Sequence, residues 1–374
     1  MKLKLYQLDI PFTAAFAHSS AVRAATQSVW VEAHADQLVG VGESCPREYV
    51  TGESVNSVHG FFETYRDGLC QEIDSVEDLA AWADTHTDII DANPAAWCAI
   101  ELALLDLFAQ RKNLPIEQVV GVAPITGTFT YSAVVGDSAP EAFHATVARY
   151  LKMGFVDFKL KLSGNAMRDR QKIDTFRDLN DVKPMRVRLD ANNLWDDAET
   201  AAHDLANLEY AFAGIEEPLA ANDIDGMRLV AARLGCPIIL DESLLRADQL
   251  APFAKDPEKW VVNVRVSKMG GLLRSLAVIK TARDLGLTII VGAQVGETSV
   301  LTRAGLVAAH ASHDVLFAQE GAFGTHLLQE DIANPSLMFE ASGVLDADAY
   351  NLSENPGWGL TVHRKADVAT VLSS

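Results

Sequence analysis

Five charged residues with regular spacing mark the second half of the chain. They are two lysines and three acids: Lys161, Asp190, Glu216, Asp241 and Lys268. Consecutive members are 25 to 29 residues apart, and each follows a short apolar run rich in β-branched residues. A β-strand with its return helix has about this length, and the carboxyl ends of successive parallel strands meet at one face. We therefore expect the five side chains to lie together.

The three acids indicate a metal site. Three carboxylates brought together repel one another unless a cation neutralises them. Mg²⁺ takes oxygen ligands and leaves coordination positions for water or a substrate carboxylate, whereas zinc favours His or Cys, which these strand ends lack. We predict Mg²⁺, with Mn²⁺ as an alternative ion, bound by Asp190, Glu216 and Asp241.

The lysines indicate acid/base chemistry. A lysine becomes an effective base when desolvation or nearby positive charge lowers its pKa. Lys159 and Lys161 are two residues apart on a predicted strand, so they face the same side and each disfavours protonation of the other. Lys268 comes four strand positions later, across an eight-strand ring. The two bases Lys161 and Lys268 are thus predicted to address opposite faces of one carbon beside a carboxylate, and the metal would stabilise the resulting enediolate.

Alternating strand and helix patterns predict the elements that carry these residues. From about residue 128 the β-rich runs are TFTYSAVV, VDFKLKL, MRVRLDA, AGIEEP, PIILDES, VVNVRVSK, LTIIVGA and VLFAQEG. A helical pattern follows each of the first seven, which predicts a (β/α)8 barrel. An open doubly wound sheet would carry a glycine-rich phosphate loop after an early strand, and none is present.

The regions on either side of the barrel have other patterns. Strands are expected near residues 3–10, 28–36 and 40–43, and helices across 54–111. We predict an α+β domain over residues 1–125, the barrel over 126–330, and a tail over 331–374 that is rich in turn formers and returns to the N-terminal region.

Composition excludes several classes of protein. The 374 residues carry 51 acids against 31 basic residues, a net charge of −20, which argues against binding of nucleic acid. No apolar run reaches the length of a membrane span, and the first residues do not have the pattern of a signal peptide. The four cysteines lie far apart. We expect a cytoplasmic protein that does not bind membranes.

Five motifs bear a family resemblance. FKLK, RLDAN, IEEP, LDES and VSKMGG resemble the enolase superfamily, in its muconate lactonizing enzyme subgroup, and the match spans nearly the whole chain. The resemblance implies an α+β capping domain, completed by the C-terminal segment, over a modified barrel. It also implies the metal ligands and lysines named above, with Lys161 and Lys268 as the acid/base pair, and a homo-oligomer.

Each of two metal ligands has an acidic neighbour. The resemblance favours Glu216 over Glu217 and Asp241 over Glu242, and neighbouring residues on a strand face opposite ways. We expect Glu242 to be a partner of Lys268 and Glu217 to form a structural ion pair. Asn192 is a further candidate for supporting the site.

In the subgroup that the chain resembles, the cap loops and the last strand select the substrate, so the resemblance implies substrate contacts in these places. Candidate substrate contacts are His18, Arg47, Tyr49, Glu297 and Glu320. Dipeptide epimerases resemble the Thr51-Gly52-Glu53 stretch, but they present Asp-x-Asp where this chain has Ala318-Gln319-Glu320. Gln319-Glu320 followed by Phe323-Gly324 is more similar to muconate cycloisomerases, although Glu320 is still a candidate for holding an ammonium group. The stretch IIVGAQVGETS contains no histidine, unlike the mandelate racemase subgroup.

The sequence therefore predicts an isomerase acting on a small carboxylate. It is either a muconate-type cycloisomerase or a racemase or epimerase of an amino-acid derivative or dipeptide. A lyase, such as an o-succinylbenzoate synthase or a dehydratase, is the alternative among enzymes. A non-catalytic binding protein would be expected to lack a lysine or a metal ligand, and all are present.

Overall fold

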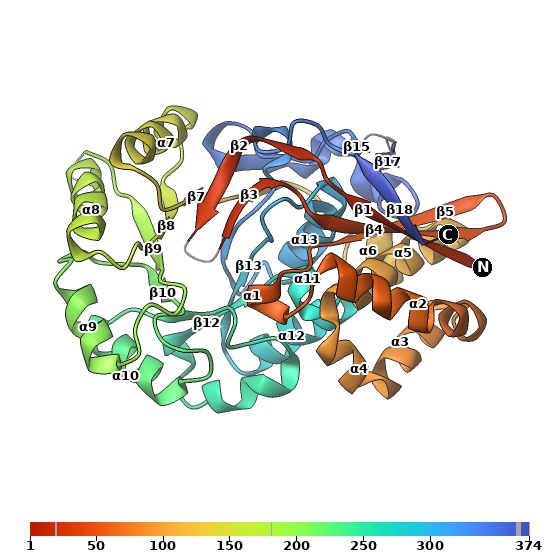
Figure 1. Cartoon of the computed structure of the whole chain (residues 1–374), viewed down its shortest axis with the longest axis horizontal. Helices are drawn as coiled ribbons and strands as arrows, with labels where there is room; N and C mark the ends of the chain where they lie inside the picture. Colours follow the sequence, from red (N-terminus) through yellow and green to blue (C-terminus); the bar gives the residue numbers. More distant parts are fainter. Residues whose placement is uncertain (19–20, 181, 364–367, 374) are drawn as a thin grey trace.

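The computed structural model describes residues 1–18, 21–180, 182–363 and 368–373, leaving out the side chains of residues 15–18, 21 and 22. An N-terminal sheet and its helices lie on the right of Figure 1, and a ring of strands and helices occupies the left and centre. No helix in these ranges is both long enough and apolar enough to cross a bilayer.

The N-terminal sheet has four antiparallel strands in the order β18-β1-β4-β5. They are β1 (Lys2–Leu8), β4 (Ser28–Ala35), β5 (Leu38–Ser44) and β18 (Ala369–Ser373). The three strands expected at the N-terminus are confirmed. A hairpin of β2 (Pro11–His18) and β3 (Ala21–Ala25) was not predicted, and it reaches toward the barrel in Figure 1. The Thr13 N–H donates to the Leu327 carbonyl oxygen at 2.7 Å, which ties this hairpin to the far end of the chain.

Helices cover the N-terminal sheet, as the sequence predicts. They are α1 (Glu48–Thr51), α2 (Val55–Glu72), α3 (Val76–Thr85), α4 (Thr87–Ala92), α5 (Pro94–Lys112) and α6 (Ile116–Val119). Ser54 caps α2, and Pro94 occupies the first turn of α5, where a missing N–H costs nothing. α5 packs on β5 at Gly42, where an added Cβ would lie 2.1 Å from the Ala99 carbonyl oxygen. Only glycine permits this close approach.

Eight parallel strands form the barrel sheet, and they follow one another in chain order. They are β7 (Ala133–Val135), β8 (Asp157–Lys161), β9 (Arg186–Asp190), β10 (Gly214–Glu216), β11 (Ile238–Leu240), β12 (Trp260–Val264), β13 (Thr288–Val291) and β14 (Leu316–Gln319). The Ser132 N–H, just before β7, donates to the Gln319 carbonyl oxygen at the end of β14 at 2.8 Å, so the first and last strands meet. The predicted barrel is confirmed.

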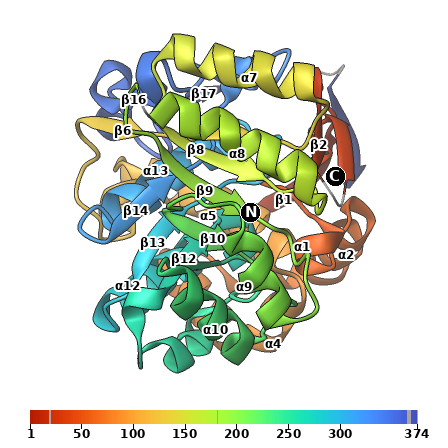
Figure 2. The ribbon, with the colours of Figure 1, turned by 90° about the vertical axis from the view of Figure 1, so that its left-hand side faces the viewer.

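The barrel helices differ from the expected series at one connection. The helices are α7 (Pro140–Met153), α8 (Ala166–Asn180), α9 (Ala198–Ala206), α10 (Ile224–Leu234), α11 (Val266–Met269), α12 (Leu272–Asp284) and α13 (Ser299–Ala311). Figure 2 shows α8, α9 and α10 on the outer side of β8 to β10. After β11 the chain instead forms 3₁₀ helices, η1 (Ala247–Phe253) and η2 (Pro257–Lys259). The helix predicted there is wrong, and Pro252 inside η1 is incompatible with a regular α-helix.

The C-terminal segment returns to the N-terminal sheet, because β18 pairs with β1. η3 (Gly324–His326) follows β14, and the C-terminal segment then holds β15 (Ala333–Asn334), η4 (Ala341–Gly343), β16 (Val344–Asp346), η5 (Ala347–Tyr350), η6 (Leu352–Glu354) and β17 (Thr361–Val362). β16 pairs with β6 (Thr128–Thr130), so TFTYSAVV is not one barrel strand but two strands in different sheets. The domain boundaries at 125 and 330 stay a prediction.

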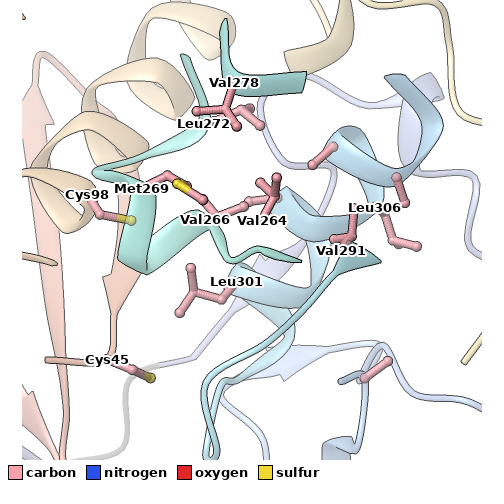
Figure 3. Packing of buried hydrophobic residues seen from close by; sticks show 14 of the residues in the cluster. Cys45, Cys98, Val264, Val266, Met269, Leu272, Val278, Val291, Leu301 and Leu306 are labelled. Carbon is pink, nitrogen blue, oxygen red and sulfur yellow. The ribbon is translucent and has the colours of Figure 1, made fainter. Parts of the chain in front are cut away.

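Buried apolar side chains fill the space between the barrel and the N-terminal helices. Figure 3 shows Met269 of α11 beside Cys98 of α5, and α11 packs against both α5 and α13. A smaller cluster of Ile239, Val261 and Ile290 fills the middle of the barrel. This packing holds α11, which carries Lys268, against α5, so the N-terminal helices help to fix the position of Lys268.

Candidate active site

The five spaced residues lie at the carboxyl ends of their strands. Lys161, Asp190 and Glu216 are the last residues of β8, β9 and β10, and they are in register across the three strands. Asp241 follows β11 directly. Lys268 lies in the short helix α11 after β12 rather than on the strand. Strand register explains the shared location, because paired positions on neighbouring strands face the same way.

Lys159 is buried and surrounded by acids. Its Nζ lies 3.2 Å from Asp190 Oδ2, 2.7 Å from Glu216 Oε2 and 3.1 Å from Glu320 Oε2. Burial acts to lower the pKa of Lys159, but the carboxylates of Glu216, Glu320 and Asp190 raise it above its usual range. The expected lowering of this pKa by Lys161 is therefore outweighed.

Lys161 and Lys268 have separate partners. Lys161 Nζ donates to Asp190 Oδ2 at 2.5 Å and to Asn192 Oδ1 at 2.8 Å, so Asn192 lies in direct contact with one of the two predicted bases. Lys268, only 1% exposed, donates to Asp241 Oδ1 at 2.9 Å and to the backbone oxygens of Asp241 and Asn263, both at 2.7 Å. Each ammonium group is thus held from its own side of the ring, by β9 in one case and by β11 and β12 in the other.

The three acids have different electrostatic environments. Burial acts against ionisation of Asp190 and Asp241, but their cationic neighbours hold the pKa of each below its usual range. For Asp190 these neighbours are Lys161 and Lys159, and for Asp241 they are Arg265 and Lys268. Burial and the charge of Asp190 raise the pKa of Glu216 to about 8. The cations near Glu216 therefore do not offset its burial and the charge of Asp190, whereas those near the two aspartates do.

Arg265 is a member of the site that the sequence did not reveal. Its Nη2 contacts Asp241 Oδ2 and lies 3.4 Å from Glu216 Oε1, while Nη1 donates to Gln294 Oε1 at 3.2 Å. Arg265 follows β12 directly, just as Asp241 follows β11. That strand-end position, three residues before Lys268, was the available signal.

The second acid of each pair takes a different place from the first. Glu217 accepts hydrogen bonds from the backbone N–H groups of Asp241 and Ser243, at 2.6 and 2.8 Å, and from the Ser243 hydroxyl at 2.8 Å. The predicted ion pair of Glu217 is therefore wrong, because hydrogen bonds alone satisfy this carboxylate. Glu242 is also not a partner of Lys268, whose three donated bonds go to Asp241 and Asn263.

A cavity of about 350 Å³ opens at this face of the barrel. Its wall includes Tyr49, Lys159, Lys161, Asn192, Asp241, Glu242, Arg265 and Glu320. Tyr49 comes from the cap helix α1, and Thr13 of β2 also contributes to the wall. A small carboxylate has room here between the barrel rim and the cap.

The remaining substrate candidates fare differently. Arg47 is buried away from this wall, and its guanidinium donates to the carbonyl oxygens of Gln27, Pro46, Thr26 and Val295. It fastens backbone segments together rather than facing the cavity. Glu297 is not part of the wall either, and its Oε1 accepts from the Gln294 N–H at 2.6 Å. The side chain of His18 lies outside the described residues.

The three acids differ from an assembled metal site in how closely they are grouped. Within the described ranges, no three His, Cys, Asp or Glu side chains are close enough together to ligate one ion as placed here. Instead, Lys159 bridges Asp190 and Glu216, and Arg265 bridges Glu216 and Asp241. Three buried carboxylates that share their cationic neighbours form an all-oxygen set suited to Mg²⁺ by its chemistry. The residues therefore fit Mg²⁺ in donor type, and the bridging cations Lys159 and Arg265 stand between the carboxylates.

Comparison with known proteins identifies the class to which this fold and site belong. Residues 142–366 match the family model described as Enolase C-terminal domain-like, and the chain belongs to this family; it is an isomerase of the enolase superfamily. N-succinyl-L-Arg/Lys racemase from Bacillus cereus is 26% identical over 96% of this chain and 95% of its own length. Muconate cycloisomerase 1 from Acinetobacter baylyi is 27% identical over 87% of both chains.

Solved structures agree with this class. The dipeptide epimerase from Methylococcus capsulatus, complexed with Mg and the dipeptide L-Arg-D-Lys, superimposes with a TM-score of 0.81. It is 25% identical and the match covers 96% of this chain and 100% of that one. The L-Ala-D/L-Glu epimerase from Bacillus subtilis has the same fold, with a TM-score of 0.85 at 24% identity. The relatives thus include both kinds of isomerase predicted from the sequence.

Proposed function

We propose that this chain is a Mg²⁺-dependent racemase or epimerase that inverts the carbon next to a carboxylate through an enediolate. The observation that supports this most is the placement of Lys161 and Lys268. They lie on β8 and just after β12, four strands apart in the ring, and their ammonium groups have separate partners. Inversion requires one group to remove a proton and a second to return it to the opposite face.

Asp190, Glu216 and Asp241 would hold the metal. When bound, Mg²⁺ supplies positive charge that stabilises the negative charge developing on the substrate carboxylate. Arg265 and Lys159 already neutralise these three acids in part. We propose that they also keep the carboxylates grouped at the rim.

The two lysines take opposite roles in each turnover, one as base and the other as acid. In one direction a neutral Lys161 takes the α-proton, and the C–H electron pair moves into the enediolate. The Lys268 ammonium group then donates a proton to the opposite face and becomes neutral. Reaction of the other stereoisomer runs through the same steps in reverse, with Lys268 as the base. Asn192 orients Lys161 by accepting its hydrogen bond at 2.8 Å.

The surroundings of Glu320 favour a substrate without a free ammonium group at this place. Glu320 was a candidate for holding such a group, but Lys159 and Arg188 already occupy its two oxygens, at 3.1 and 2.6 Å. A third cation would be repelled by both. We therefore favour an amino-acid derivative whose nitrogen is acylated. The name of the Bacillus cereus relative, an N-succinyl-Arg/Lys racemase, points to the same class.

A substrate panel with Mg²⁺ tests this proposal. N-acetyl and N-succinyl amino acids would be compared with dipeptides of the same residues that carry a free amino terminus, using chiral chromatography to follow inversion. We expect inversion of N-acyl compounds with kcat/KM at least about tenfold above the dipeptides, because each 1.4 kcal/mol of lost stabilisation is a factor of ten. Preference for the free amine would overturn the substrate class, and no inversion of any compound would overturn the reaction.

Muconate-type cycloisomerisation is the second candidate. Gln319-Glu320 followed by Phe323-Gly324 resembles cycloisomerases, and one curated relative is a muconate cycloisomerase. This reaction needs only one lysine to deliver a proton. One of the two single variants, Lys161→Ala or Lys268→Ala, would therefore stop it, and the other would leave it running. Loss of muconate absorbance on addition of enzyme would support it. A β-elimination would instead release a leaving group, such as water, from the substrate.

The remaining predictions concern the setting of the protein. A cytoplasmic location, a homo-oligomeric state and the absence of nucleic-acid and membrane partners stay predictions from sequence. Gel filtration with light scattering measures the oligomeric state directly.

A further inference from the structure

A buried lysine outside the cavity forms a hydrogen bond with the backbone of Lys161. Lys172, in α8, is only 6% exposed. Its Nζ donates to Asp137 Oδ1 at 2.9 Å, to Asp169 Oδ1 at 3.0 Å and to the Lys161 carbonyl oxygen at 2.9 Å. A lysine ammonium group has three N–H donors, and all three are used here. The contact with the Lys161 carbonyl is therefore part of a complete set rather than a chance approach.

Asp169 holds the residues that follow Lys161. Its carboxylate accepts from the Ser163 N–H at 2.9 Å, from the Ser163 hydroxyl at 2.9 Å and from the Gly164 N–H at 3.1 Å. Lys172, one helical turn later, pairs with the same carboxylate. The backbone from Lys161 to Gly164 is thus fastened to the first turns of α8 at both of its ends.

Asp137 connects this cluster to the substrate cavity. It lies in the loop after β7 and contributes to the cavity wall that also includes Lys161. Arg168 donates to Asp137 Oδ1 at 2.7 Å, so this carboxylate keeps one cationic partner even without Lys172. Removal of the Lys172 charge would therefore leave both acids with other hydrogen bonds.

We infer that Lys172, together with Asp169, is a positioning residue for Lys161 and acts on only one of the two proposed bases. The side chain of Lys161 begins at the peptide that Lys172 holds, and a displacement of about 1 Å at a reacting group costs on the order of 100-fold in rate. Lys268 is held by Asp241 and Asn263. Within the described part of the chain, neither of these two residues forms a hydrogen bond with Asp137, Asp169 or Lys172. This inference rests on the proposed two-base function.

The one-sided action separates positioning from simple stabilisation. If Lys172 only joined α8 to the barrel, its loss would lower proton abstraction from both stereoisomers equally, since both need a folded site. If it positions Lys161, abstraction by Lys161 falls and abstraction by Lys268 persists. The persisting step still exchanges the α-proton of one stereoisomer, because Lys268 can return a solvent deuteron to the face from which it took the proton.

The experiment measures exchange of the α-proton in D2O with Mg²⁺, starting from each stereoisomer of an N-acyl amino acid separately. For Lys172→Met we expect exchange from one stereoisomer to fall about 10- to 100-fold and from the other by less than about threefold. The rate of racemisation should fall by the same factor as the slower of the two exchange rates. The matched control is Lys280→Met on α12, whose lysine is exposed and pairs with Asp284 at 2.7 Å. It should leave both rates unchanged.

A second variant covers failure to fold. Asp169→Asn keeps an oxygen that can accept from Ser163 and removes the charge that pairs with Lys172, so it should give the same one-sided loss, with circular dichroism verifying the fold. Equal losses for both stereoisomers, or none, in the folded variants would overturn the positioning role. If the unaltered enzyme exchanges neither stereoisomer, the proposed function itself is wrong. If it exchanges both and only the variants behave symmetrically, this inference alone is wrong.

Discussion

Arg188 donates from Nη1 to Glu320 Oε1 at 2.6 Å, in the interior of the barrel just beneath the candidate active site. Arg188 is fully buried in β9, two residues before Asp190, and its Nη2 also donates to Ser132 at 2.6 Å and Asp157 at 3.2 Å. The pair joins the middle of the sheet to the end of β14. It also sets the charge that a substrate meets there, because a neutralised Glu320 no longer attracts an ammonium group.

Arg188→Met is expected to destabilise the fold. Removal of one member of a buried ion pair costs about 3–5 kcal/mol, and the Lys159 ammonium group that still faces Glu320 at 3.1 Å places the expected cost at the lower end of this range. Urea unfolding followed by circular dichroism measures this difference. Arg233→Met, which breaks an exposed pair with Glu199, is the control and should change stability by no more than about 0.5 kcal/mol. A similar, small effect for both variants would contradict the importance of the buried pair.

The sequence predicted those parts of the site that depend on repeat length. Asp190, Glu216 and Asp241 share a phase in successive βα units, and this phase alone brings them to one face. Arg188 and Arg265 were missed because their contacts cross between strands, and spacing does not show which side chains pair. The role of Arg47 was misjudged for a related reason: a polar residue in a cap loop was expected to meet substrate, but four backbone carbonyls hold it.

One error in the fold has a related origin. TFTYSAVV has the composition of one strand, yet the Tyr131 and Ser132 N–H groups bond in different directions, to Gly343 and Gln319. The strand therefore ends at Thr130, and β7 begins at Ala133. Only the position of the distant C-terminal segment decides this break, and local pattern carries no information about that segment.

Mg²⁺ binding should distinguish Glu216 from its neighbour in the sequence, Glu217. An ion that binds only the folded state stabilises it by about 2.7 kcal/mol at 100 times its Kd. We expect a Mg²⁺-dependent rise in Tm that Glu216→Gln abolishes. Glu217→Gln should lower Tm without metal, because the amide NH2 that replaces one carboxylate oxygen cannot accept from the Ser243 hydroxyl, but it should keep the rise. The reverse result would show that the wrong acid of the pair has been assigned to the metal.

Glu101 should make stability depend on pH. Burial in α5 raises its pKa to about 7, although the Leu273 N–H donates to Oε1 at 3.0 Å. Because the folded pKa lies above the unfolded value of about 4.3, the contribution of this group is fully present below about pH 4.3 and is lost as pH rises through 7. A shift of this size corresponds to roughly 3 kcal/mol.

Glu101→Gln tests this dependence. Gln keeps an oxygen for the Leu273 N–H and cannot ionise, so stability relative to the unaltered protein should increase by roughly 3 kcal/mol between pH 5 and 8. Urea unfolding at several pH values measures it. Glu77→Gln, at an exposed position in α3, is the matched control and should give a difference that does not change with pH. A constant difference for Glu101→Gln as well would contradict ionisation of this buried group.

The most direct test of the two-base account is solvent deuterium exchange by Lys161→Ala and Lys268→Ala, assayed with Mg²⁺ on each stereoisomer of a substrate that the unaltered enzyme inverts. The account predicts that both variants lose inversion, by at least about 100-fold, and that each retains exchange from one stereoisomer only, with opposite preferences. Inversion that continues at the original rate in Lys268→Ala, or exchange from the same stereoisomer in both variants, would contradict it.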